Sequence, residues 1–154
     1  MNNPRLKEIL DEWRWARGLS RDLLDGLPEG HLEQVPIQGA GSWGRQFRHM
    51  GRVEENYVVA LRLGTVRFST EGCSYAGAIS KRGLIDYLSR MDILLAETVA
   101  LGLTQVDWFG KLWSGERHLA ALVSHEILHH GQLILYARAS ALRLPDSWKD
   151  WGEA

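Results

Sequence analysis

The sequence predicts an all-α protein, a four-helix bundle with up-down-down-up topology and a long crossover between its second and third helices. Four segments of about 20 residues repeat apolar side chains at three- and four-residue steps, the period of an amphipathic helix. Strand signals are weak, and only 66–70 and the stretch WFGKLW at 108–113 look extended. We expect a single bundle domain over residues 1–154.

The first two helices have clear boundaries. The first is expected from about Pro4 to Asp25. The second should begin after Ser42, because a serine side chain can accept a hydrogen bond from the free N–H groups of a first helical turn. It should continue to about Leu63, where Gly64 is placed to end it.

The third and fourth helices are expected over about Ser80–Leu101 and Ser114–Leu142. Gly102 follows the third helix, and Pro145 prevents much extension of the fourth. About 15 residues, 65–79, connect the second helix to the third. A connection of that length can cross the bundle from end to end, so the two helices it joins can run parallel.

Composition excludes several classes of function. The chain is 45% hydrophobic and 24% charged, with a formal net charge of −1, which gives no electrostatic reason to expect nucleic acid or an anionic membrane as a partner. No run approaches the roughly 18 apolar residues that a membrane span needs. Its one cysteine, Cys73, excludes an internal disulfide and is compatible with a reducing compartment. We therefore expect a cytoplasmic protein.

The segment SHEILHHGQLILYAR contains the pattern H-E-x-x-H, formed by His125, Glu126 and His129. Histidines four apart on a helix share one face, with Cβ atoms about 5–6 Å apart, so this pair can bind one ion. In zinc peptidases the glutamate activates a water and a third residue completes the site. Here Leu135 stands where one peptidase class has a third histidine, and the only downstream glutamate is Glu153. A zinc peptidase is therefore an alternative that depends on Glu126.

A third ligand has to come from another element. His49 lies within the second helix beside a core stripe and is the best-placed candidate, whereas His31 lies in a polar turn. On the fourth helix, Gln132 and Tyr136 fall within about 60° of the histidine pair. They are the candidate catalytic residues, although core packing is an equally good explanation for Tyr136. The role of His118, two turns earlier on the same face, stays open.

Two further surfaces are candidates for binding. Arg45, Arg52 and Asn56 lie within about 60° of His49 on the second helix, where they could bind an anionic group of a small-molecule substrate. The fourth helix carries a second apolar stripe on the side away from the histidines, formed by Val123, Ile127 and Ile134. Such a stripe needs cover, which predicts a homodimer through this face unless loops or the tail cover it.

These residues together resemble the DinB/YfiT-like metalloenzymes. The resemblance rests on a mid-helix histidine after a Ser/Gly-rich loop, on H-x-x-x-H-x-G-Q-L in the last helix, and on the tail LPDSWKDWG at 144–152. It implies a bundle with parallel second and third helices. It also implies one divalent metal ion, zinc or nickel, held by His49, His125 and His129. The chain departs from the family in having His130 where arginine is common.

The resemblance also indicates a reaction class. Members with known chemistry are thiol-dependent S-transferases or isomerases that use low-molecular-weight thiols such as bacillithiol or mycothiol. It therefore implies metal-assisted attack of a thiol or water on a small electrophile. The rival interpretation is a non-catalytic, stress-related bundle with a structural metal ion. Cys73 lies in a loop away from the histidines and is not expected to be catalytic.

Overall fold

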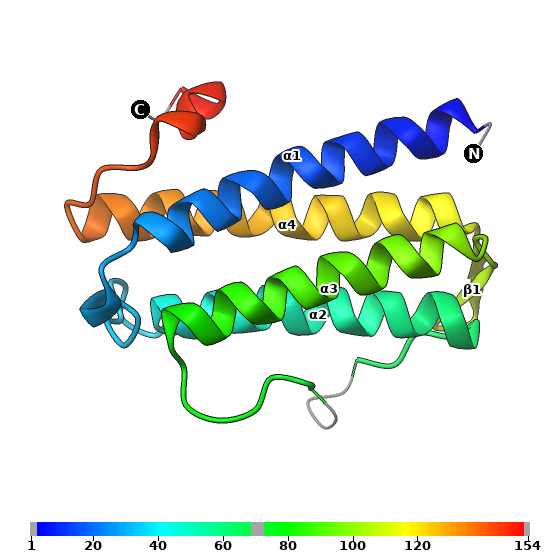
Figure 1. Cartoon of the computed structure of the whole chain (residues 1–154), viewed down its shortest axis with the longest axis horizontal. Helices are drawn as coiled ribbons and strands as arrows, with labels where there is room; N and C mark the ends of the chain where they lie inside the picture. Colours follow the sequence, from blue (N-terminus) through cyan, green and yellow to red (C-terminus); the bar gives the residue numbers. More distant parts are fainter. Residues whose placement is uncertain (1–2, 69–72, 153–154) are drawn as a thin grey trace.

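The computed structural model describes residues 3–68 and 73–152. Figure 1 shows α2 and α3 running in the same direction and α1 and α4 in the opposite one, which confirms the up-down-down-up bundle. The elements are α1 (Pro4–Gly26), η1 (Glu29–His31), α2 (Trp43–Leu63), α3 (Lys81–Ala100), β1 (Val106–Trp108), β2 (Lys111–Trp113), α4 (Gly115–Ala139) and η2 (Asp146–Trp151).

Side-chain caps set where the helices begin. The side chains of Ser42, Ser80 and Ser114 each accept a hydrogen bond from the backbone N–H three residues later. Asn3 does the same for α1. These bonds satisfy donors that the first helical turn leaves free. The predicted starts are confirmed for this reason.

The helix ends follow the prediction less closely. Gly64 ends α2 in the left-handed conformation, with φ of 72°. The fourth helix stops at Ala139, before the expected Leu142, because Ala141 adopts a φ of 51° that a helix cannot continue through. Because α4 ends early, the segment after it can turn back and place η2 alongside α1.

The stretch WFGKLW forms a hairpin in which β1 and β2 pair antiparallel. Phe109 and Gly110 form its two-residue turn and both have positive φ, 51° and 83°, as the mirror-image hairpin turns require. Of the expected strand at 66–70, the described residues 66–68 are not in a strand. Thr65 makes an isolated bridge to Asp107, and residues 69–70 lie outside the described part of the chain.

The helices pack in the order α1, α4, α2, α3 around the bundle, and the α1–α3 side is the least closely packed. Figure 1 shows α1 and α3 in front of α4 and α2. Gly51 permits the close approach of α2 and α3, since a Cβ there would lie 2.5 Å from the Tyr87 ring. The resulting apolar core has two halves, one containing Phe47 and Trp148 and the other Trp13 and Tyr57.

The outer apolar stripe of α4 differs from the prediction. Val123 is only 7% exposed, and Ile127 and Ile134 pack against the core. Residues of α1 and α3 cover the Val123 end of the stripe within the same chain. The large apolar side chains that α4 exposes are instead Leu128 and Leu135, at 61% and 53%. The three predicted residues therefore do not form an open dimer face.

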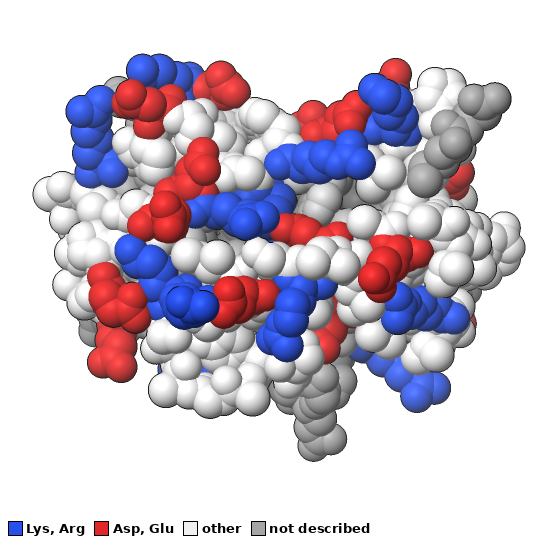
Figure 2. All heavy atoms as spheres, in the orientation of Figure 1, with Lys and Arg blue, Asp and Glu red and all other residues white. Residues whose placement is uncertain are grey.

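The face formed by α1 and α3 carries basic and acidic side chains interspersed along both helices (Figure 2). This mixture agrees with the small net charge of the sequence, −1. Within the described residues, no helix combines the length and the apolar character needed to cross a bilayer.

Candidate metal site

Three histidines from two helices converge near the middle of the bundle. His49 comes from α2, His125 and His129 come from α4, and one nitrogen of each lies within 4.8 Å of the others. The Nε2 atoms of His125 and His129 are 3.2 Å apart. The His49 ring centre lies 5.4 Å from that of His125 and 5.0 Å from that of His129. This arrangement can offer three imidazole ligands to one ion.

The electrostatics of the cluster favour neutral imidazoles. Burial, with the other histidines adding to it, lowers the pKa of His125 to about 3. Burial lowers the pKa of His129 to about 4, with His49 adding to the shift and the neighbouring Gln132 side chain opposing it. Burial also lowers the pKa of His49, and the nearby Arg52 charge adds to this. The three rings are therefore uncharged at neutral pH, as metal ligands must be.

The second nitrogens of these rings differ in their contacts. The Nδ1 atoms of His125 and His129 are buried and have no hydrogen-bond partner among the described residues. The Nδ1 of His49 lies 3.2 Å from Nη2 of Arg52. Because a guanidinium can only donate, this Nδ1 accepts, and the ring proton is then on Nε2. Neither nitrogen of His49 can bind a cation in that state, so metal binding requires the Arg52 contact to break.

A cavity of about 310 Å³ opens beside the histidines. It is lined by His49, Arg52, Val53, Asn56, Tyr57, Phe68 and His125. Of the candidate anion-binding residues, the structure thus brings Arg52 and Asn56 to the cavity. Arg45 is exposed and does not line it. Arg52 and Asn56 give the cavity a polar side, and Val53, Tyr57 and Phe68 give it an apolar side.

The two candidate catalytic residues of α4 differ in their surroundings. Gln132 is half-buried beside His129, and its side-chain oxygen has no hydrogen-bond partner among the described residues. The Tyr136 hydroxyl donates to the Gly41 carbonyl at 2.6 Å and accepts from Gln46 at 3.0 Å. Its ring packs edge-on against Trp43. Tyr136 therefore joins α4 to the start of α2 and does not line the cavity.

The remaining histidines lie away from the candidate ligand set. The ring of His118 is fully buried between Tyr57 and Trp108, and its Nε2 lies 2.9 Å from the Tyr57 carbonyl oxygen. His31 lies in η1, at a half-buried position. His118 therefore contacts a backbone carbonyl and two aromatic rings, and its role in this structure is structural.

Sequence reasoning missed a second polar cluster, which we call the Arg17 cluster. It consists of Arg17, Glu54, Asp92 and Glu126, together with Ser20 and His130. Arg17 Nη2 pairs with Glu54 at 2.7 Å and with Glu126 at 3.4 Å, and Arg17 Nε lies 3.5 Å from Asp92. Burial raises the pKa of all three carboxyl groups, while the Arg17 charge opposes the shift.

Glu126 belongs to this cluster and not to the histidine site. Its side chain is fully buried and accepts a hydrogen bond from Ser20 at 2.7 Å, in addition to its pairing with Arg17. The side of α4 on which it lies is covered by α1. A peptidase would need this carboxylate free beside the metal's water. The zinc peptidase alternative is therefore not supported by the geometry.

His130 is also part of the Arg17 cluster. Its Nε2 lies 2.9 Å from the Ser20 hydroxyl, and its ring packs against Trp148 from the tail. Burial lowers its pKa to about 4. Trp148 in turn donates to the Leu19 carbonyl at 3.0 Å. His130 therefore connects α4 to α1 and to the C-terminal tail, and it points away from the histidine cluster.

A signal for the missed cluster was present in the sequence. Arg17 lies four residues after Trp13, Glu54 four after Met50, and Asp92 four after Leu88, so each charge falls on an apolar stripe. Charged residues on a core face are buried only when paired. Three such positions on three helices predict a buried ionic cluster.

The fold and site together define a four-helix-bundle protein with a three-histidine candidate metal site between its second and fourth helices. The chain belongs to the DinB family, whose model matches residues 1–140. It is similar to a DinB-like protein from Bacillus cereus ATCC 10987, with 21% identity and a TM-score of 0.74, over 90% of this chain and 95% of that one. A DinB-like protein from Bacillus subtilis has 18% identity and a TM-score of 0.71, over 91% and 96%. None of the curated proteins matches this chain in sequence.

Proposed function

We propose that this protein is a divalent-metal-dependent enzyme of the DinB type that transfers a thiol to, or hydrolyses, a small electrophilic molecule. The observation that carries the proposal is the convergence of His49, His125 and His129 beside a cavity of about 310 Å³. The Nε2 atoms of His125 and His129 face each other at 3.2 Å, the arrangement that two imidazole lone pairs need to bind one ion.

The donor set fits a borderline divalent ion such as zinc or nickel, since imidazole nitrogen suits both. Three protein ligands leave coordination positions open to a small molecule, as in catalytic rather than structural sites. When bound, such an ion lowers the pKa of a coordinated thiol or water, so that a nucleophile exists at neutral pH. Gln132, beside His129, is placed to orient that imidazole.

The cavity's own residues indicate what it could hold. Arg52 and Asn56 lie on one side, and once Arg52 releases His49 its guanidinium can pair with a carboxylate or another anionic group. Val53, Tyr57 and Phe68 form an apolar side that excludes water from the bound molecule. We infer a small substrate with an anionic part and an apolar part.

The thiol in this proposal comes from a separate low-molecular-weight compound. The chain's own Cys73 does not line the cavity, and its Sγ lies 3.2 Å from the Tyr87 hydroxyl on α3. Tyr87 also donates to Glu55 at 2.7 Å, which holds this region together as a structural contact. We further propose a cytoplasmic location and a homodimer, with Leu128 and Leu135 as the exposed apolar residues of α4 available to the interface.

Metal content tests the proposal directly. Mass spectrometry of the purified, untagged protein should find about one equivalent of metal in the wild type and much less in His49→Ala. We expect this substitution to lower the metal affinity by at least roughly 100-fold. His31→Ala, which changes a histidine outside the cluster, should keep the metal. Absence of metal from the wild type after reconstitution with zinc and nickel would reject the enzyme proposal.

The enzyme is distinguished from a non-catalytic bundle by an open coordination position. Cobalt-substituted protein should change its visible absorption when cysteine is added as the probe thiol, because the thiolate enters the ligand set. An unchanged spectrum at millimolar cysteine would favour a metal ion with a purely structural role.

A further inference from the structure

The cavity beside the candidate metal ligands is lined mainly by rings. Four of its seven lining side chains are those of His49, Tyr57, Phe68 and His125. Its volume of about 310 Å³ exceeds the roughly 150 Å³ in which an apolar cavity can hold benzene, so one substituted ring fits. The lining extends along α2 from His49 to Tyr57, about 12 Å at a rise of roughly 1.5 Å per residue. A bound molecule can therefore reach the histidines with one end and contact Tyr57 and Phe68 with the other.

Phe68 offers ring surface that no protein group covers. Its ring centre lies 5.9 Å from that of Tyr57, 5.6 Å from that of Trp108 and 6.2 Å from that of Phe109. These contacts hold the ring in place, yet the side chain is still 49% exposed. Aromatic rings pair favourably in offset-stacked or edge-on arrangements with centres about 4.5–7 Å apart. A ring in the cavity can therefore contact Phe68 as the neighbouring aromatic residues do.

The Tyr57 hydroxyl is a donor without a protein partner. Its side chain is only 5% exposed, and the hydroxyl makes no hydrogen bond with any described residue. Burial raises the pKa of Tyr57 to about 12, so the hydroxyl is protonated at neutral pH and can donate. Leaving such a group unpaired is costly, so it needs water or a ligand as its acceptor. The cavity that Tyr57 lines provides the space for one.

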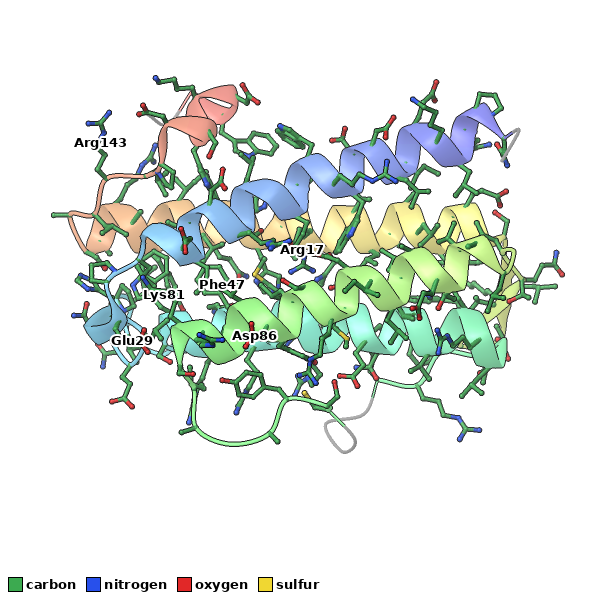
Figure 3. All side chains as sticks on the ribbon, in the orientation of Figure 1. Arg17, Glu29, Phe47, Lys81, Asp86 and Arg143 are labelled. Carbon is green, nitrogen blue, oxygen red and sulfur yellow. The ribbon has the colours of Figure 1, made fainter. Side chains whose placement is uncertain are left out.

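Arg52 places an uncompensated positive charge at the same cavity. Its only side-chain hydrogen bond among the described residues is with His49, whose ring is neutral, and no described carboxylate pairs with it. Arg17, by contrast, lies between α1 and α3 (Figure 3), where three carboxylates surround it. The charge of Arg52 favours an anionic group on the molecule in the cavity.

Resting on the proposed function, we propose that the substrate of this site is an aromatic carboxylate, selected by Phe68, Tyr57 and Arg52. The ring of the substrate packs against Phe68. Its carboxylate accepts hydrogen bonds from the Tyr57 hydroxyl and from the Arg52 guanidinium. None of these contacts needs a metal ion, so the binding can be measured in metal-free protein.

Three substitutions separate the features of the site. Phe68→Leu removes the ring and keeps an apolar side chain at the cavity. Phe109→Leu is its control, because it makes the same change in a ring that is 70% exposed and does not line the cavity. Tyr57→Phe removes the hydroxyl alone and keeps the backbone carbonyl that His118 contacts. Because the hydroxyl has no protein partner, Tyr57→Phe should fold as stably as the wild type.

The test is a titration of the whole, chelator-treated chain with benzoate, cyclohexanecarboxylate and benzylamine, followed by backbone amide chemical shifts. Benzoate should shift amides of α2 between His49 and Tyr57, and benzylamine should not. Phe68→Leu should weaken benzoate binding about three- to tenfold, the range for one aromatic pair, and cyclohexanecarboxylate binding less than about twofold. Tyr57→Phe should weaken the binding of both carboxylates at least about tenfold, and Phe109→Leu that of neither.

Several results would overturn this assignment. They are equal losses for the two carboxylates in Phe68→Leu, an equal loss of benzoate binding in Phe109→Leu, unchanged benzoate binding in Tyr57→Phe, equal binding of benzylamine, and no shifts with benzoate at millimolar concentration. Metal content tests the proposed function separately. A wild type that binds benzoate as expected but takes up neither zinc nor nickel would reject the enzyme and leave the aromatic-carboxylate site standing.

Discussion

The histidine cluster and the Arg17 cluster occupy consecutive positions of α4 but meet opposite requirements. His125 and His129 face α2, whereas Glu126 and His130, each one residue later, face α1. The 100° step between helical neighbours separates the two sets. The Nδ1 atoms of His125 and His129 have no hydrogen-bond partner among the described residues, and a cavity opens beside His125. In the Arg17 cluster, three carboxylates lie 2.7–3.5 Å from Arg17, although Arg17 Nη1 and His130 Nδ1 have no hydrogen-bond partner among the described residues.

Both clusters form one polar layer across the middle of the bundle. On α3 and α4, the buried residues of one apolar half end before this layer and those of the other half begin after it, and on α1 and α2 the change from one half to the other falls within the layer. A polar layer inside a core lowers stability unless its members are paired, and it fixes the register of the helices that carry it. The paired cluster can therefore hold the unpaired one in position, which is the arrangement a preformed metal site needs.

The largest expected effect comes from removing the central cation of the paired cluster. Arg17→Ala leaves Glu54 and Glu126 buried without their partner, and we expect a loss of about 3–5 kcal/mol in the free energy of unfolding, measured with urea. Arg14→Ala, at an exposed position of the same helix, should have little effect on stability. If Arg17→Ala were as stable as the wild type, the pairing would not hold the layer together.

A smaller loss is expected from Glu126→Gln. The amide can still accept from Ser20, but Arg17 keeps only Glu54 and Asp92 as ion-pair partners, so we expect about 1–2 kcal/mol of destabilisation. Metal content should stay at the wild-type level, since this residue does not face the histidines. Loss of metal in Glu126→Gln would show that the two clusters are not separable, and it would contradict the division of α4 into two faces.

The structural roles of these residues differ in how well the sequence predicts them. Ser42 and Gly64 place α2 to the residue, because caps act locally. The spacing of His125 and His129 likewise indicates a pair of metal ligands, because residues four apart share one face of a helix. By contrast, the partners of Glu126 come from α1, more than 100 residues away, and the cover over Val123 comes from α1 and α3. Only the packing order of the helices determines these contacts. Arg52 contacts His49 by a choice of side-chain rotamer, which no sequence pattern specifies.

A third prediction concerns that contact. Arg52→Gln removes a positive charge next to the candidate site, and unit charges about 4 Å apart in water interact by about 1 kcal/mol, with a dication contributing roughly twice that. We expect metal affinity to rise by roughly 30-fold at most, since about 1.4 kcal/mol corresponds to a factor of ten, as measured by competition with a chelating dye. Arg45→Gln changes an exposed arginine of the same helix that does not line the cavity, and it should leave the affinity unchanged. A decrease in Arg52→Gln would mean that Arg52 supports the site instead of competing with the metal.

The smallest expected effect concerns pH and lies outside both clusters. Burial lowers the pKa of His118 below its ordinary value of 6.5 in the folded protein, although the hydrogen bond to the Tyr57 carbonyl opposes the shift. The unfolded chain therefore binds a proton more readily than the folded one as the pH falls below 6.5. The stability contributed by neutral His118 is complete above that pH and is lost progressively toward the folded pKa, by about 1.4 kcal/mol for each unit of pKa difference.

His118→Gln isolates this contribution, because an amide can donate to the Tyr57 carbonyl but does not titrate. Urea unfolding in the presence of a chelator, from pH 7.5 to pH 5, should show a shallower loss of stability in the variant than in the wild type. Other buried histidines contribute equally to both proteins and cancel in the difference. Identical slopes would mean that His118 has the same pKa in the folded protein as in the unfolded chain, so that its ring reaches water in the folded protein. That result would contradict its assignment as a buried structural residue held between Tyr57 and Trp108.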